Sequence, residues 1–180
     1  NGDGTYDVTL YVYNTFVSWN RSPKIITVDA NVPVYEGSDV PLYAGKGDTE
    51  LWVLLLEKAY AQYEGDYDDI EGGFTEEAMG LLLGEDGEAY DTDDYSDDDL
   101  KKKIQAALDG KKAITASTNS KTKKKESVTV DGQKIWYSHA YNLLKLNGNK
   151  VYLQNPHGVN DVELSISDFK KYYRSISIQD

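Results

Sequence analysis

The spacing of apolar residues predicts strands at both ends of the chain and helices in its middle. Apolar residues at every second position predict strands at residues 5–13 and 24–34. In residues 50–63 they recur at helical spacing, which places Trp52 and Leu55 on one face of a helix that Thr49 can cap. Further helices are predicted at residues 75–83, from the cap Ser96 to Gly110, and at 167–173, with strands at 112–118, 135–146, 150–154 and 175–178. Strands, then helices, then mostly strands are typical of an α+β fold.

A predicted hairpin near the end of the chain holds the first candidate site. Its strands are residues 135–146 and 150–154, with His139 on the first and Asn155, followed by a proline, at the end of the second. A side-chain amide that binds one imidazole nitrogen fixes the ring and leaves the other nitrogen for a nucleophile. A histidine near a strand end is also common as a structural residue, and Asn-Pro often starts a turn.

The register of this hairpin decides whether the two side chains can meet. Successive side chains of a strand point to opposite faces, so a shift of one residue separates them. If residues 147–149 form a three-residue loop, His139 lies opposite His157, and Asn155 is one diagonal step away on the same face. A two-residue turn at residues 147–148 would put Asn155 on the other face. Catalytic use of the pair therefore requires the longer loop or a β-bulge.

Composition excludes several classes of function. A net charge of -12 on 180 residues argues against nucleic acid and anionic membranes as partners. No apolar run reaches the roughly 18 residues of a membrane helix. The chain has no cysteine, which excludes disulfides, thiolate metal sites and a cysteine nucleophile within it. This composition fits a bacterial protein that is secreted or held at the cell surface, which is the location we expect.

The acidic run at residues 85–99 is a candidate calcium site, because calcium prefers oxygen ligands. Its spacing differs from that of an EF-hand loop, and the three aspartates after Ser96 suit the first turn of a helix. We expect a solvated loop and a helix cap here, with no metal and no cofactor. Calcium is the alternative.

Several stretches, in the same order along the chain, resemble the calpain family of cysteine peptidases. The family's Leu-Leu-Glu-Lys-Ala-Tyr-Ala helix and Gly-Gly turn are similar to residues 51–84, LWVLLLEKAYAQYEGDYDDIEGGFTEEAMGLLLG. The stretch with the catalytic histidine is similar to HAYNLLKL, and the Asn-Pro-Trp-Gly stretch to LQNPHG. The segment ISDFKKYY resembles the Ser-Asp-Phe segment that follows, and NGDGTYDVTLYV looks like a strand of bacterial members. The resemblance runs from residue 1 to 180.

The resemblance implies a papain-like cysteine peptidase fold, whose catalytic domain has two lobes. The first lobe is helical and carries the cysteine. The second is strand-rich, an antiparallel sheet or barrel with flanking helices, and carries the histidine and the asparagine. On this resemblance, residues 1–180 are the second lobe alone, as one domain.

The resemblance also assigns roles to single residues. His139 falls at the place of the general base and Asn155 at that of the residue that orients it. The places where family members bind the substrate backbone are Gly72, Gly73 and Ser138, the last replacing a glycine of vertebrate calpains. His157 replaces a tryptophan that shields the contact between Asn and His. An insertion that carries calcium ligands in vertebrate calpains is absent, so calcium activation is not expected.

The missing nucleophile shapes the predicted function. We expect the cysteine upstream of Asn1 or on a processed partner chain, the Cys-bearing first lobe, so that this chain alone is inactive. The expected substrate is a protein or peptide. The alternative is a non-catalytic calpain-like binding module that has lost the nucleophile. A transglutaminase-like enzyme is a further alternative, although such enzymes orient the histidine with Asp, where this chain has Asn155.

Overall fold

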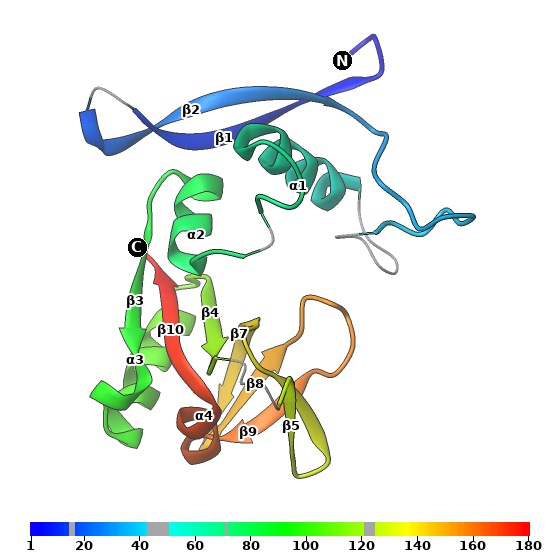
Figure 1. Ribbon diagram of the computed structural model, residues 1–180. Helices are drawn as coiled ribbons and strands as arrows, with labels where there is room; N and C mark the ends of the chain where they lie inside the picture. The colour runs from blue at the N-terminus through cyan, green and yellow to red at the C-terminus, as the bar shows by residue number, and fades with distance from the viewer. Residues whose placement is uncertain (15–16, 43–50, 71, 121–124) are drawn as a thin grey trace. The chain divides into compact units, whose positions relative to one another are not determined.

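The structure, a computed structural model, describes residues 1–14, 17–42, 51–70, 72–120 and 125–180 (Figure 1). By its internal contacts the chain divides into two compact units, Asn1–Asp86 and Gly87–Asp180. Residues 1–180 were expected to be one lobe, and the two units are described separately below. The predicted helix cap Thr49 lies outside the described residues. In the described parts of the chain, no helix is both long and apolar enough to cross a membrane.

The first unit is a two-stranded ribbon with two helices packed against it. Strands β1 (Thr5–Asn14) and β2 (Val17–Asp29) pair antiparallel and form the long ribbon in Figure 1. Helices α1 (Leu51–Glu64) and α2 (Thr75–Leu83) follow, the second with the predicted bounds. The core of the unit consists of Leu10, Ile26, Val28, Leu55, Ala59 and Leu81. Trp52, predicted on the same face as Leu55, is 59% exposed instead.

Strand β2 ends five residues before the sequence pattern suggested, at Asp29. The carboxylate of Asp29 accepts the backbone N–H of Asn31 at 2.7 Å, which is an Asx turn. It also accepts a hydrogen bond from Lys58 of α1 at 2.6 Å. The local turn therefore overrides the apolar alternation that continues beyond residue 29.

One buried guanidinium joins the ribbon to α2. The Arg21 side chain, 7% exposed, donates through Nε and Nη2 to Asp86 Oδ1 at 2.9 and 2.7 Å. It also donates to the backbone oxygen of Tyr11 at 2.9 Å and to that of Glu77 at 3.4 Å, and its carbon Cζ lies 4.1 Å from the centre of the Tyr13 ring. A buried charge is tolerated because it is paired and bonded in this way.

The second unit is a six-stranded sheet in the order β3-β10-β4-β7-β8-β9, antiparallel at every pairing. Its strands are β3 (Gly87–Asp91), β4 (Ile114–Thr118), β7 (Ala140–Asn147), β8 (Lys150–Gln154), β9 (Val162–Ser165) and β10 (Tyr173–Gln179). A separate hairpin is formed by β5 (Ser127–Val130) and β6 (Gln133–Trp136). The helical elements are η1 (Thr92–Asp94), α3 (Asp97–Asp109) and α4 (Ile166–Tyr172). Helices and antiparallel strands together agree with the predicted α+β class.

The core of this unit lies on one face of the sheet. Side chains of β4 and β8 alternate between buried and accessible positions. Leu100 and Ile104 of α3 and Phe169 of α4 are fully buried and belong to the same core cluster as the strand residues. Ser96 caps α3 as predicted, because its side chain accepts the N–H of Asp99. The acidic run thus contains a strand, a short 3₁₀ turn and a helix start.

Strands β3, β5 and β9 are not among the predicted strands, and one predicted strand is divided. Neither β3 nor β9 was predicted, because each is short and rich in charged or polar residues. Residues 135–146 were predicted as one strand but belong to β6 and β7. The break lies at Ser138, whose φ of 49° is incompatible with an extended strand.

We predict that Gly80→Ala destabilises the first unit, although alanine is the better helix former. A Cβ at Gly80 would collide with Asp86 Oδ1 and Arg21 Nε, and the arginine is held by several hydrogen bonds. We expect a loss of about 1–3 kcal/mol in the free energy of unfolding, measured by urea denaturation. Ala78→Gly on the exposed side of the same helix is the control and should cost about 1 kcal/mol. A Gly80→Ala variant more stable than the wild type would contradict the role of the Arg21 contacts.

Candidate active site

The candidate site depends on the register of the hairpin β7–β8. Asn147 pairs with Lys150, so the turn is the two residues Gly148 and Asn149, which is neither the three-residue loop at 147–149 nor the two-residue turn at 147–148. Gly148 has a φ of 59°, as the first central residue of a type II′ turn requires. Further down, Lys145 pairs with Tyr152 but Leu143 with Leu153, which leaves Leu144 as an extra residue. A β-bulge was one of the two features that could bring His139 and Asn155 to the same face, the other being a three-residue loop.

The bulge brings His139 and Asn155 to the same face. His139 directly precedes β7, and Asn155 directly follows β8. His139 Nε2 lies 3.0 Å from Asn155 Oδ1, within hydrogen-bond distance. Asn155 is 1% exposed, whereas His139 is half-buried. The predicted hydrogen bond between the two side chains is therefore present.

A backbone group fixes which nitrogen of His139 carries the proton. The N–H of His157 points to Asn155 Oδ1 at 3.1 Å, and a backbone N–H can only donate. The atom that faces it must be the amide oxygen, so the same oxygen also faces His139 Nε2 and accepts from it. In the neutral ring Nε2 then carries the hydrogen, and Nδ1 has the lone pair that can accept a proton.

Thr118 holds the backbone of His139. The hydroxyl of Thr118 accepts the N–H of His139 at 2.9 Å and donates to the oxygen of His139 at 2.9 Å. The backbone N–H of Thr118 donates to the same oxygen at 2.9 Å. The last regular pair between β4 and β7 is Ser117 with Ala140, so these bonds extend the ladder by one position. The histidine is thereby tied to the central part of the sheet.

Two aromatic rings confine the imidazole. The ring of Tyr141 makes a T-shaped contact with it, with 5.0 Å between ring centres and 83° between planes. The ring of His157 stacks on it with 5.0 Å between centres and 10° between planes. Tyr141 is itself fixed, because its hydroxyl accepts the N–H of Trp136 at 3.1 Å and its ring packs against Tyr173. Burial raises the pKa of Tyr141, so it stays a neutral phenol.

The predicted substrate-binding residues lie in both units. Ser138 is next to His139 and has a left-handed backbone, the conformation that suits the glycine of vertebrate calpains. Gly72 and Gly73 belong to the first unit, in the segment before α2. Both are exposed, and a Cβ added at either would meet no atom within 4 Å. Both glycines are therefore accessible to solvent.

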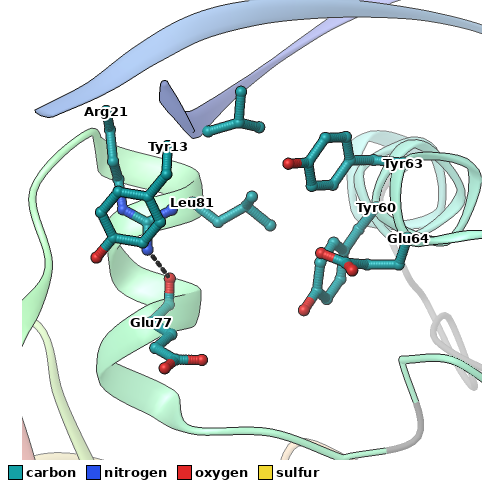
Figure 2. Close-up of a pocket in the computed structure, with 8 residues that line it drawn as sticks. Tyr13, Arg21, Tyr60, Tyr63, Glu64, Glu77 and Leu81 are labelled. Carbon is teal, nitrogen blue, oxygen red and sulfur yellow. Dashed lines mark hydrogen bonds between the residues drawn. The ribbon is translucent and has the colours of Figure 1, made fainter. Parts of the chain in front are cut away.

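Neither a metal site nor a second catalytic group emerges from the described residues. Among them, no three side chains of His, Asp or Glu are grouped to hold a metal ion. The first unit has a pocket of about 310 Å³. Figure 2 shows it lined by Tyr13, Arg21, Tyr60, Tyr63, Glu64, Glu77 and Leu81. Its guanidinium is bonded to Asp86, and its lining contains neither histidine nor serine.

Comparison with known proteins identifies the family. The family model described as "Calpain family cysteine protease" matches residues 2–180. The chain belongs to the calpain family. The calpain-2 catalytic subunit of Gallus gallus is 32% identical over 118 residues, which are 66% of this chain and 16% of that protein. The calpain-1 catalytic subunit of Rattus norvegicus is 32% identical over 142 residues, 74% of this chain and 19% of that protein. A calpain-type cysteine protease of Zea mays is 35% identical over 92 residues, 51% of this chain and 4% of that protein.

This calpain-family chain therefore spans at most about a fifth of the length of these relatives.

Three residues that contact His139 or Asn155 were not singled out from the sequence: Thr118, Tyr141 and Asp161. Thr118 is 21 positions from His139 along the chain, so no local pattern links them. The alternation of side chains along a strand could have placed Tyr141 on the same face as His139, because the two are two positions apart.

We predict that Thr118→Val destabilises the second unit of the calpain-family chain by about 1–3 kcal/mol. In the wild type the N–H of His139 donates to the hydroxyl of Thr118. Valine keeps the shape of threonine but has no hydroxyl, so this N–H loses its acceptor. Thr118→Ser keeps the hydroxyl and should lose less than half as much. Urea unfolding measures both, with Thr129→Val on an exposed position of β5 as control. Equal stability of Thr118→Val and Thr129→Val would show that the hydroxyl contributes nothing.

Proposed function

We propose that this chain supplies the histidine and asparagine of a calpain-like cysteine endopeptidase, and that the cysteine comes from a preceding segment or a partner chain. The observation that carries the proposal is the 3.0 Å contact between His139 Nε2 and Asn155 Oδ1. This contact uses one ring nitrogen and leaves Nδ1 for proton transfer. The unit Gly87–Asp180, which contains both residues, would then be the lobe that carries the base.

In the proposed reaction, His139 transfers a proton twice, once in acylation and once in deacylation. Nδ1 takes the proton of the cysteine thiol, which gives a thiolate and an imidazolium. The thiolate attacks the carbonyl carbon of the peptide bond, and the tetrahedral intermediate expels the amine, which receives the proton from Nδ1. Nδ1 then takes a proton from water, whose oxygen attacks the carbonyl carbon of the acyl-enzyme; the C–S bond breaks, the acid is released, and the leaving thiolate takes the proton from Nδ1 to restore the thiol.

Asn155 supports the charged form of the ring at each of these steps. Its amide oxygen is an uncharged acceptor, so it favours the N–H at Nε2 in the neutral and the charged ring alike. Because Asn155 is buried and fixed, it needs no rearrangement when charge develops on the imidazole. His139 is confined between Tyr141 and His157, which limits rotation of the ring away from this bond.

The remaining roles follow from family membership and the exposed backbone. Gly72, Gly73 and Ser138 would bind the main chain of a protein or peptide substrate. Neither calcium nor another cofactor is needed for the proton transfers described. We place the complete enzyme outside the cell or at the surface of a bacterium, and expect neither nucleic acid nor membrane as a partner.

A non-catalytic binding module is the second candidate. One observation favours it: the 180 residues contain no cysteine. The hydrogen bond between His139 and Asn155 weighs against it, because a module without catalysis has no need for an oriented histidine.

We predict that the complete protein, with its Cys-bearing segment, cleaves a fluorogenic peptide and is inactivated by thiol alkylation. His139→Ala should lower kcat/KM at least about 10³-fold, since it removes the base. Asn155→Ala should cost about 10²-fold, since it misplaces the ring without removing it. The matched control is Asn142→Ala, an exposed amide on β7, which should leave the rate within about twofold.

Two outcomes would contradict the proposed function. One is full activity of His139→Ala in the complete protein. The other is peptide cleavage by the 180-residue chain alone, since it offers a base and its orienting residue but no thiol. A complete protein that binds peptides without cleaving them would support the binding module.

A further inference from the structure

The carboxylate of Asp161 contacts the backbone of Asn155, the residue whose side chain binds His139. Its Oδ1 accepts the backbone N–H of Asn155 at 2.8 Å. Its Oδ2 accepts the hydroxyl of Tyr152 at 2.7 Å. Asp161 therefore links β8, where Tyr152 lies, to the residue that binds His139. The resemblance to the family assigns no role to this residue.

The bond to Asn155 replaces a missing rung of the sheet. The last regular pair between β8 and β9 is Leu153 with Val162, so no strand residue pairs with Asn155. Asn155 is almost completely buried, and its N–H needs an acceptor. Asp161 directly precedes β9 and supplies a carboxylate oxygen, which is a stronger acceptor than a backbone carbonyl.

The loop between Asn155 and Asp161 aims the asparagine side chain. The N–H of Gly158 donates to the backbone oxygen of Asn155 at 2.9 Å, which closes a turn. Within this turn, the N–H of His157 binds Asn155 Oδ1 and fixes the amide. Gly158 and Asn160 both have positive φ, 73° and 61°, which bend the chain back toward the sheet. The position of the amide thus depends on a loop whose far end is held by Asp161.

Tyr152 makes this support rigid. It lies within β8, paired with Lys145 on one side and Glu163 on the other. Its hydroxyl holds the second carboxylate oxygen, and this hydrogen bond raises the pKa of Tyr152, so the phenol keeps its proton at neutral pH. A continuous series of hydrogen bonds therefore runs from Tyr152 through Asp161 and Asn155 to His139.

We infer that Asp161 is a positioning residue of the proposed peptidase: through the backbone of Asn155 it sets the hydrogen bond that orients His139. The inference rests on the proposed function for its catalytic meaning. The effect of Asp161 on the hydrogen bond of His139 can be tested without catalysis, because the Nε2–H of His139 can be observed in the 180-residue chain, which has no nucleophile.

The first test uses ¹⁵N NMR of the histidine side chains in the 180-residue chain. In the wild type we expect a slowly exchanging Nε2–H signal of His139 and the Nε2–H form of the neutral ring. Asp161→Ala should abolish this signal or accelerate its exchange at least tenfold. Asp161→Asn should keep it, because the amide oxygen can accept from Asn155 while the amide nitrogen donates to Tyr152. Tyr152→Phe should give an intermediate rate.

The matched control is Asp168→Ala. Asp168 is also a carboxylate of the second unit, and it accepts a hydrogen bond from the hydroxyl of Ser165 at the start of α4. Its loss should lower stability without changing the exchange of the His139 signal. An unchanged signal in both Asp161→Ala and Tyr152→Phe would overturn the inference. If Asp161→Ala does not fold, Tyr152→Phe decides, since it removes only one hydroxyl.

The second test uses the complete protein and separates kcat from KM. Asp161→Ala should lower kcat about 10- to 10²-fold with KM within about twofold, and Asp161→Asn should restore most of the rate. Equal kcat for Asp161→Ala and wild type would overturn the role in catalysis. If the NMR signal depends on Asp161 but the complete protein cleaves no peptide, the proposed function fails and the positioning of His139 by Asp161 stands.

Discussion

The alternation of side chains along a strand is the constraint on which the site depends. With the two-residue turn at Gly148 and Asn149, a regular hairpin would place His139 and Asn155 on opposite faces of the sheet. The extra residue Leu144 reverses the facing of every residue before it, so that Tyr141 and His139 turn to the face of Asn155. Leu144 itself is half exposed. The contacts of the imidazole with Asn155, Tyr141 and His157 all follow from this one bulge.

The buried amide of Asn155 lowers the stability of the fold. Its oxygen accepts two N–H groups and its backbone N–H binds Asp161, but the amide nitrogen Nδ2 has no hydrogen-bond partner among the described residues. An unpaired buried donor costs about 1–3 kcal/mol. The surroundings tolerate this cost because Thr118 and Asp161 fix the backbones of His139 and Asn155 by four hydrogen bonds in total. Strain of this kind concentrates where a side chain has a task other than stability.

Local features of this chain could be predicted from sequence, and features that cross the sheet could not. Helix α2, strand β8 and the cap Ser96 were predicted correctly, because each depends on residues close in the chain. The sequence did not decide whether a bulge is present, since neither the turn residues nor Leu144 has a distinctive pattern. Thr118 and Asp161 were missed because their partners lie on other elements. His139 and Asn155 were found through motifs that resemble the family, whereas the division at Asp86 left no mark in the spacing of apolar residues.

His157 shows how the site can depart from the family without losing its geometry. Residue 157, at the place of the family's shielding tryptophan, acts on the site in two ways: its backbone N–H orients the asparagine, and its side chain covers the contact between Asn155 and His139. The first needs no particular side chain, and here the N–H of His157 supplies it at 3.1 Å. The second depends on ring area, and the imidazole of His157 stacks on His139 but is smaller than an indole and exposed. The substitution therefore reduces the cover of the hydrogen bond between His139 and Asn155, and leaves the orientation of the amide intact.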